Sequence, residues 1–436
     1  MSRALSSNLP AAILLFTSAL LSNHCVALYG QELCRTVAGD VFGGLLVGVD
    51  EDDGFVFDTN TGTQTVSPDD LFSWNALRDS AAGTQVLLAD GSLIVASDVA
   101  LEGESLLVDA DLFGEPQGFS IAGRSKLPIS SVRAIIFRVP LVSLERDVLF
   151  QKIADHQDAE DQLWLANGDL VQGTLTSLGR AESDDQQAGA AVVSLKAESG
   201  DVTISADSPQ RGLLDKVTAV VFNPQLLRPV RNNQPHTLAG FADGSRLRAT
   251  ALKPSGERIE YSLLCGVSIT SHADLNGPRQ ITSLQSFGHT QHYLADQKLV
   301  EYRHIPLLER TWPLGVNENV LGGRLRSVGN MYVQGICMHS RSRARFALDQ
   351  PYSKFQAEVA IDESAGHRGS ATVVVLSDAS GKFKITGEPI PIRGGKPPVS
   401  ISVDISGAKN IALFVESADH GTQLDRANWL NARLIK

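Results

Sequence analysis

The sequence contains few of the residues that build disulfide frameworks, helical bundles or basic surfaces. Its 436 residues include four cysteines and three methionines, and 6% of them are aromatic. Lysine and arginine number 38 against 49 aspartates and glutamates, which gives a net charge of -11 without a basic block. Phosphate backbones are bound by clustered positive charge, so nucleic acid is not an expected partner.

The remaining composition is that of a folded, turn-rich chain with a bias toward β-structure. The hydrophobic fraction is 43% and there are 38 glycines, which excludes wholesale disorder. Valine, isoleucine, leucine and threonine are spread along the chain and favour strands. A chain of this length exceeds what one hydrophobic core serves, so we expect about two to four domains.

Catalytic motifs are also missing. The sequence has no H-E-x-x-H, G-x-S-x-G, Walker or C-x-x-C motif. Acidic pairs such as Asp52-Asp53 and Asp69-Asp70 are adjacent, so on a strand they point to opposite faces, whereas glycosidase carboxylates face each other across a cleft. The sequence therefore predicts a protein that is not an enzyme.

The amino end predicts export. Arg3 is the only charge before Glu32, and residues 9–21 are rich in apolar side chains. Cys25-Val26-Ala27 then supplies small residues for cleavage after Ala27, as in a secretory signal peptide. The apolar run is shorter than the roughly 20 residues of a membrane span, although an uncleaved anchor remains the alternative. We expect a secreted, periplasmic or envelope protein with no transmembrane segment in the mature chain.

Cysteine usage does not predict a disulfide scaffold. Cleavage after Ala27 leaves Cys34, Cys265 and Cys337. An odd, sparse set allows at most one bridge, and three buried free thiols explain the sequence equally well.

A turn motif recurs before residue 300. Asp90-Gly91, Asn167-Gly168 and Asp243-Gly244 each lie between apolar runs, and Asp-Gly or Asn-Gly in that setting is a strong hairpin signal. Similar apolar phrases close the first two copies at residues 127–137 and 213–222. We interpret three full β units and one reduced unit. The predicted segments are 36–80 for the reduced unit, 81–142, 143–228 with a short helix over 144–154, and 229–295.

The shape of each unit is left open by the sequence. The order of turn, strand, glycine, strand and closing apolar strand loosely resembles an Sm-like or SH3-like small barrel. A twisted sheet or a β-sandwich built from the same hairpins fits the pattern equally well. In the helix, Leu144, Val148, Leu149 and Ile153 follow the 3.6-residue period, which predicts that these four side chains pack inward.

The last third of the chain, residues 301–436, has a different pattern. Four strand-like runs at 355–362, 369–376, 400–405 and 410–416 are separated by glycine, proline, aspartate and serine clusters. This arrangement predicts an antiparallel sandwich.

These residues resemble a known family, the NPCBM carbohydrate-binding module. The likeness rests on the Gly-x-x-x-His-x-x-Ser phrase at 335–342, on 352–362, on Gly369, and on the phrases at 403–408 and 425–434. The phrases occur in family order between 311 and 436, but Ala360 and Asn431 depart from the usual glycine and aspartate. The resemblance implies a galactose-binding-like jelly roll that binds a glycan through loops at one end, with a structural calcium ion in some members.

Sugar recognition combines an apolar ring face with a few fixed donors and acceptors. The two phrases that the family brings together supply candidates for this role, each with a structural alternative in which Trp429 is a core residue and His339 is a buried, hydrogen-bonded histidine. The candidate sugar-binding residues are His339, Ser340, Ser342, Asp425, Asn428 and Trp429. Calcium prefers carboxylate oxygens, and the candidate ligands for it are Asp362, Glu416 and Asp425. No other cofactor is expected.

The combined prediction is an exported, non-catalytic, all-β protein that adheres to glycans through its C-terminal module. A structural or protein-binding envelope component with a degenerate sugar site is the alternative. A hydrolase with an unrecognised site in the repeats is the third hypothesis.

Overall fold

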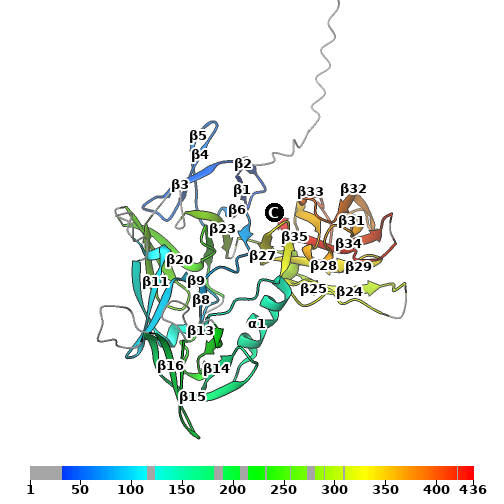
Figure 1. The fold of residues 1–436 in the computed structure, drawn as a ribbon. Helices are drawn as coiled ribbons and strands as arrows, with labels where there is room; N and C mark the ends of the chain where they lie inside the picture. The colour runs from blue at the N-terminus through cyan, green and yellow to red at the C-terminus, as the bar shows by residue number, and fades with distance from the viewer. Residues whose placement is uncertain are drawn as a thin grey trace, which may run out of the picture. The chain divides into compact units, whose positions relative to one another are not determined.

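The structure is a computed structural model that describes residues 32–114, 123–180, 190–206, 215–230, 233–255, 257–272, 280–288, 290–307, 310–419 and 421–436. The predicted signal peptide, residues 1–27, lies outside the described residues. The fold is all-β, and Figure 1 shows α1 (Ser143–Asp155) as the α-helix of the described part of the chain. No described helix is long and apolar enough to cross a bilayer.

The chain before residue 290 consists of four successive meanders. The first contains β1 (Leu33–Thr36), β2 (Val41–Gly43), β3 (Leu45–Val49), β4 (Phe55–Thr59), β5 (Gly62–Val66) and β6 (Leu71–Trp74). The second contains β8 (Thr84–Leu88), β9 (Leu93–Ala96), β10 (Asp98–Glu102), β11 (Ser105–Ala110), β12 (Gly123–Pro128) and β13 (Val132–Ile136). The third contains β14 (Asp161–Leu165), β15 (Leu170–Arg180), β16 (Ala191–Ala197), β17 (Gly200–Ser205) and β18 (Val217–Val221). The fourth contains β19 (His236–Phe241), β20 (Arg246–Ser255), β21 (Arg258–Leu263), β22 (Ser268–His272) and β23 (Ile281–Phe287).

Each meander is closed by pairing between its first and last strands. β1 pairs with β6, β8 with β13, β14 with β18 and β19 with β23, all antiparallel. The hairpins β8–β9, β14–β15 and β19–β20 turn at Asp90-Gly91, Asn167-Gly168 and Asp243-Gly244, as the turn motif predicts. The meanders are joined, because β13 pairs with β18 and β23 pairs with β6 within one 16-stranded sheet.

The helix α1 forms where the sequence predicts it, but its buried face differs. Leu149 and Ile153 are buried as expected, whereas Leu144 and Val148 are about half exposed. The polar residues Arg146 and Asp147 are buried instead. The predicted inward face is therefore wrong for two of its four residues, because buried ion pairs rather than apolar contacts hold that side of the helix.

These ion pairs connect the helix to residues far along the chain. Arg146 lies 2.5 Å from Asp79, and Arg326 lies 2.6 Å from Asp79 and 2.5 Å from Asp147. Arg326 belongs to a small sheet of β26 (Leu325–Ser327), β27 (Asn330–Tyr332) and β7 (Leu77–Arg78). Charges that are buried in pairs like these are costly to separate.

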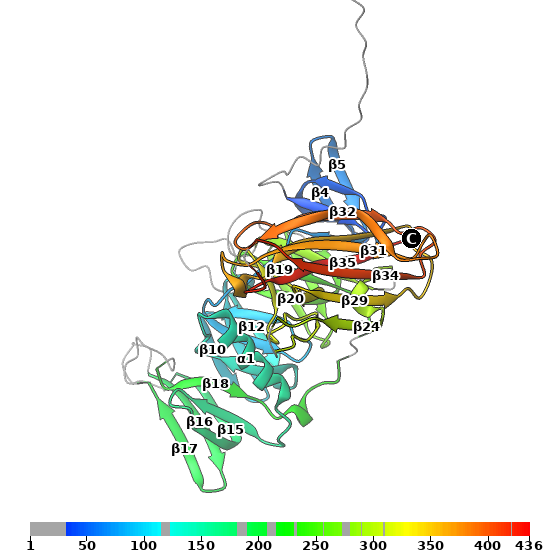
Figure 2. The ribbon, with the colours of Figure 1, turned by 90° about the vertical axis from the view of Figure 1, so that its right-hand side faces the viewer.

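The C-terminal third is a sandwich of two five-stranded sheets. One sheet has the order β24 (Lys298–His304), β29 (Ser342–Ala347), β34 (Asn410–Ser417), β31 (Ser370–Ser377) and β32 (Lys384–Arg393), and Figure 2 shows these strands side by side. The other has the order β25 (Gly315–Val316), β28 (Gly335–His339), β35 (Arg426–Ile435), β30 (Lys354–Ile361) and β33 (Val399–Asp404).

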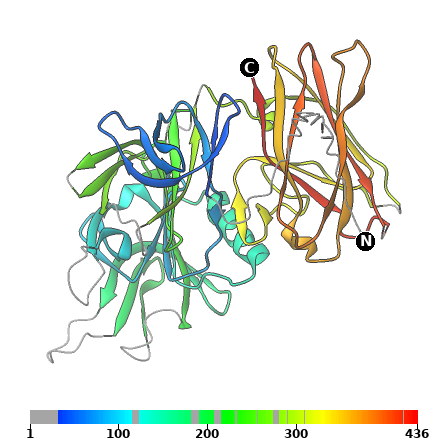
Figure 3. The same cartoon turned by 90° about the horizontal axis from the view of Figure 1, so that it is seen from above.

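The two sheets share one apolar interior. Alternate side chains of each strand point inward, and the buried set includes Phe346, Phe355, Val373, Leu413 and Trp429. Figure 3, the view from above, shows the strands of this sandwich in yellow to red. The prediction of an antiparallel sandwich at the end of the chain is confirmed.

All three described cysteines are free and buried. Cys34, Cys265 and Cys337 have no disulfide partner among the described residues. Burial raises the pKa of the Cys34 thiol to about 12, so this side chain is a neutral, small core group at physiological pH. Of the two interpretations of the cysteine pattern, the structure shows the buried free thiols.

Candidate functional site

Several loops of the sandwich lie together at one end. β28 and β35 are antiparallel and pair His339 with Arg426, while β31 and β32 pair Ser370 with Arg393. These four residues are the terminal residues of their strands. The loops that adjoin them therefore lie at the same end of the sandwich. We call the described residues of 339–342, 362–370, 393–398 and 418–426 the rim.

Four of the predicted sugar-binding residues lie at the rim but are buried in it. Exposure is 5% for His339, 0% for Ser340 and Ser342, and 1% for Asp425. The Ser340 amide donates to the Asp425 carbonyl at 2.9 Å, and the Ser370 amide donates to the Asp425 carboxylate at 3.0 Å. These side chains support the loops from beneath, and they do not present hydroxyl-binding groups at the surface.

Asn428 and Trp429 point to opposite faces of their sheet, as successive residues of a strand must. Trp429 is fully buried in the sandwich interior with its ring 6.3 Å from that of Phe355. Trp429 therefore lies where its structural alternative places it, in the core, and its ring is not exposed to a sugar. The buried Asn428 amide donates to the Asp362 carboxylate at 2.7 Å and to the Arg326 carbonyl at 3.2 Å, so it serves as an internal connector.

The predicted calcium ligands do not converge. Asp362 is buried and accepts hydrogen bonds from Asn428 and from Ser364, whereas Glu416 is an exposed residue of β34. Within the described residues, no group of three or more histidine, cysteine, aspartate or glutamate side chains is placed to hold a metal ion. The side chains of Asp362, Glu416 and Asp425 therefore do not form a common ligand set.

A partly exposed aromatic cluster borders the rim, and the sequence analysis missed it. The Trp312 ring stacks on the His339 imidazole with centroids 4.9 Å apart and an interplanar angle of 6°. The guanidinium of Arg310 lies 4.3 Å and that of Arg426 5.7 Å from the Trp312 ring. The Trp312 amide donates to Nδ1 of His304 at 3.2 Å. Trp312 precedes the quoted family phrases. Its position in a loop before a strand is the sequence feature that could have marked it as a candidate sugar-binding residue.

Burial keeps the central histidine of this cluster neutral. Removal from water lowers the pKa of His339 to about 4, and the charges of Arg426 and Arg310 act in the same direction. The imidazole is therefore uncharged at pH 7. A neutral ring can lie flat against Trp312 without bringing a third positive charge next to the two arginines.

The rim encloses a cavity of about 600 Å³. The volume falls within the roughly 300–1,000 Å³ of small-molecule sites. Its walls come from three rim loops, and the lining residues are His367, Arg368, Gly369, Arg393, Gly394, Lys396, Gln423 and Leu424. We call this cavity the basic pocket. Leu424 has a φ of 63°, a conformation that is uncommon for a residue with a bulky side chain and that occurs where surrounding structure enforces it.

The basic pocket and the aromatic cluster are joined through Arg426. Its guanidinium lies near the Trp312 ring and donates to the Ser364 carbonyl at 3.0 Å. Ser364 belongs to the loop that continues to His367 and Arg368 in the pocket wall. One connected surface thus offers a tryptophan edge, several cationic donors and the amide of Gln423.

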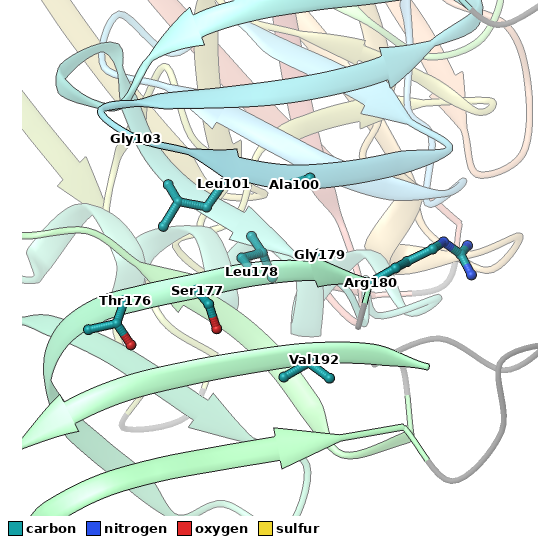
Figure 4. Close-up of a pocket in the computed structure, with 9 residues that line it drawn as sticks. All are labelled: Ala100, Leu101, Gly103, Thr176, Ser177, Leu178, Gly179, Arg180 and Val192. Carbon is teal, nitrogen blue, oxygen red and sulfur yellow. The ribbon is translucent and has the colours of Figure 1, made fainter. Parts of the chain in front are cut away.

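A second hollow, of about 490 Å³, lies in the repeat region between β10 and β15 (Figure 4). Ala100, Leu101 and Leu178 supply apolar groups there. The guanidinium of Arg180 already contacts the Asp98 carboxylate at 3.1 Å. This lining has few convergent polar groups, so the rim is the better candidate for a ligand site.

The fold defines a β-sandwich module with a cavity at its rim, and comparison with known proteins places it more closely. Residues 290–435 match the family model described as the NPCBM/NEW2 domain. The match confirms the resemblance in the sequence and extends it upstream to include β24.

The chain also has a curated relative and structural neighbours. A protein of Renibacterium salmoninarum named "Putative endo-alpha-N-acetylgalactosaminidase" is 27% identical over 114 residues, which is 26% of this chain and 7% of the relative. The chain therefore spans a small fraction of that protein.

Two of the solved neighbours are modules from Clostridium perfringens. One contains CBM51-2 in complex with GlcNAc and INT domains of ZmpB, with 20% identity, coverage of 44% of this chain and 41% of that one, and a TM-score of 0.29. Another is the CBM51 of GH95 in complex with methyl-galactose, with 17% identity, coverage of 33% and 99%, and a TM-score of 0.29. Likeness at these TM-scores transfers no ligand site to this chain.

Proposed function

We propose that this protein is an exported, non-catalytic glycan-binding protein that adheres to carbohydrate through the rim of its C-terminal sandwich. The observation that carries the proposal is the NPCBM/NEW2 match over residues 290–435 together with a cavity of about 600 Å³ at the loop end of the same sandwich. Export is supported by the signal-like order of residues 1–27. N-terminal sequencing of the exported chain tests it, since cleavage after Ala27 is the expected result.

The rim chemistry suits binding. A partly exposed tryptophan offers an apolar edge that a sugar ring can contact. Side-chain amides and guanidinium groups donate hydrogen bonds to hydroxyl oxygens. Trp312 and Gln423 supply these two kinds of group on one connected surface.

Three of the four carboxylates among the described rim residues support a non-catalytic role. Asp362 and Asp425 are buried and accept hydrogen bonds from protein donors. Asp419 lies 2.7 Å from the Arg393 guanidinium and accepts from the Ser370 hydroxyl at 2.7 Å. Glycoside hydrolysis uses two carboxyl groups that face the scissile bond from opposite sides, and these three are engaged in holding loops.

A structural or protein-binding role is the second candidate. The observation that favours it is the burial of all six predicted sugar-binding residues, which include Trp429 in the core. In that case the sandwich keeps its fold while the rim binds no sugar.

A glycan array probed with the purified full chain separates these functions. We expect binding to a subset of glycans, and we expect Trp312→Ala to reduce the signal about tenfold, because the loss of an aromatic contact costs about 1.5 kcal/mol. Trp164→Ala, which removes a half-buried tryptophan from β14 of the third meander, is the matched control and should bind normally. Circular dichroism checks that both variants are folded.

Two outcomes contradict the proposal. If the wild-type chain binds no glycan on a broad array, the structural role replaces adhesion. If the purified chain releases reducing sugar from a polysaccharide, the non-catalytic role is wrong.

A further inference from the structure

We infer that the basic pocket selects anionic saccharides, in which a carboxylate or sulfate group of the sugar binds between Arg368 and Lys396. This inference rests on the proposed glycan-binding function and names its ligand class. The two anionic groups share one chemistry, since both are compact oxyanions that accept charge-assisted hydrogen bonds from guanidinium and ammonium groups.

The charge of the lining carries the inference. The eight lining residues include two arginines, one lysine and one histidine, and none of them is an aspartate or glutamate. The whole chain has the opposite sign, with a net charge of -11. The lining of the pocket therefore has the opposite sign to the chain as a whole, which favours an anionic ligand there.

Two of the pocket cations lack an internal counter-charge. Arg393 is paired with Asp419 at 2.7 Å. Arg368 and Lys396 are exposed, and neither makes an ion pair within the residues that the structure describes. Cations that line a concave surface without a carboxylate partner are available to an anionic ligand.

The pocket is also held in shape by its backbone. The Gly394 amide donates to the Gly369 carbonyl at 2.8 Å and ties two of the three loops together. A Cβ atom at Gly394 would lie 2.3 Å from the Gly366 carbonyl oxygen, and one at Gly369 would lie 2.4 Å from the Leu424 carbonyl oxygen. Such close approach requires glycine. The pocket is thus preformed, which lowers the entropic cost of binding.

The neighbouring aromatic cluster explains why the ligand is a saccharide and not a free anion. Arg426 places Trp312 beside the loop that lines the pocket. An acidic sugar can bind its charged group in the pocket while the next ring of the chain contacts Trp312. Gln423 adds an uncharged donor and acceptor for hydroxyl groups.

The test measures equilibrium binding of the full chain to size-matched oligosaccharides by isothermal titration calorimetry. The arms are an oligogalacturonate, which carries carboxylates, a sulfated galactan oligosaccharide, and a neutral galactan oligosaccharide, with duplex DNA as an unrelated polyanion. We expect at least one anionic saccharide to bind about tenfold or more tighter than the neutral one, and the tighter arm identifies the oxyanion. Its affinity should fall as sodium chloride rises from about 0.05 to about 0.5 M, because salt screens exposed charges.

The diagnostic variant is Arg368→Gln with Lys396→Gln. Both side chains are exposed, so folding should be preserved, and we expect the anionic saccharide to lose about tenfold or more in affinity while the neutral one is unchanged. The matched control is Lys382→Gln with Lys384→Gln, which removes the same charge from exposed positions at the other end of the β31–β32 hairpin.

The outcomes separate the inference from the function on which it rests. Equal binding of neutral and anionic saccharides, or an equal loss in the control variant, overturns the anionic selectivity and leaves glycan binding intact. Binding of DNA as tightly as the saccharides overturns the saccharide assignment. Binding of no saccharide at all overturns the proposed function itself.

Discussion

Acidification should destabilise the sandwich through His339. This side chain is 5% exposed, and burial lowers its pKa to about 4, against about 6.5 in an unfolded chain. The unfolded state therefore binds more protons than the folded state between these values. The stabilisation is fully present above about pH 6.5 and is lost progressively as the pH falls toward about 4.

The size of the effect follows from the two pKa values. At pH 5 the histidine is almost fully protonated when unfolded and almost neutral when folded, so linkage gives a loss of about 2 kcal/mol relative to pH 7.5. Protonation in the folded state would also place a positive ring near the Arg310 and Arg426 guanidinium groups that surround Trp312.

Urea denaturation of the wild-type chain and of His339→Gln at pH 7.5 and pH 5 measures this effect. Histidines with lowered pKa that do not contact His339, such as His236 of β19, contribute equally to both proteins and cancel in the difference. We expect the unfolding free energy of the variant to change by about 2 kcal/mol less than that of the wild type over this interval. Identical pH dependences in the two proteins would show that folding does not lower the pKa of His339.

Three further substitutions test other parts of the structure. Arg326→Met should cost about 3–5 kcal/mol in denaturant unfolding, because it leaves the buried Asp79 with Arg146 alone and the buried Asp147 with only the more distant Arg324; a loss below about 1 kcal/mol would show that the Arg326 pairs are not formed. Trp429→Ala should lower stability by about 3–5 kcal/mol by opening a core cavity, and a loss of glycan binding with unchanged stability would restore it as a surface platform. Gly394→Ala should weaken glycan binding and lower the melting temperature. The control Gly48→Ala should do neither, because an added Cβ there meets nothing within 4 Å. Equal behaviour of the two variants would contradict the close packing of the rim loops.

Local sequence signals predicted the elements of this fold well. The Asp-Gly and Asn-Gly pairs mark hairpins because both residues tolerate the turn conformation, and the structure has hairpins at Asp90, Asn167 and Asp243. The sandwich strands also follow their hydrophobic period, and the helix forms where it was predicted, although two of its four periodic apolar residues are exposed. These features depend on neighbours in sequence, which a single chain displays directly.

Features that depend on distant partners could not be predicted in the same way. Arg146 and Asp147 are buried because they pair with Asp79 and Arg326. These partners lie 67 and 179 residues away from them in the sequence. His339 was identified by its motif, but its stacking partner Trp312 precedes the motif and meets it only through the fold. The basic pocket likewise combines three loops that are far apart in the sequence. None of these loops contains a run of basic residues that would predict a pocket.

Hydrogen exchange of the full chain with and without its best saccharide locates the binding surface. We expect slower amide exchange confined to the rim, above all in residues 362–369 and 393–398, with the meanders before residue 290 unchanged. Protection that appears in the meanders instead, or no protection at saturating saccharide, would contradict binding at the rim.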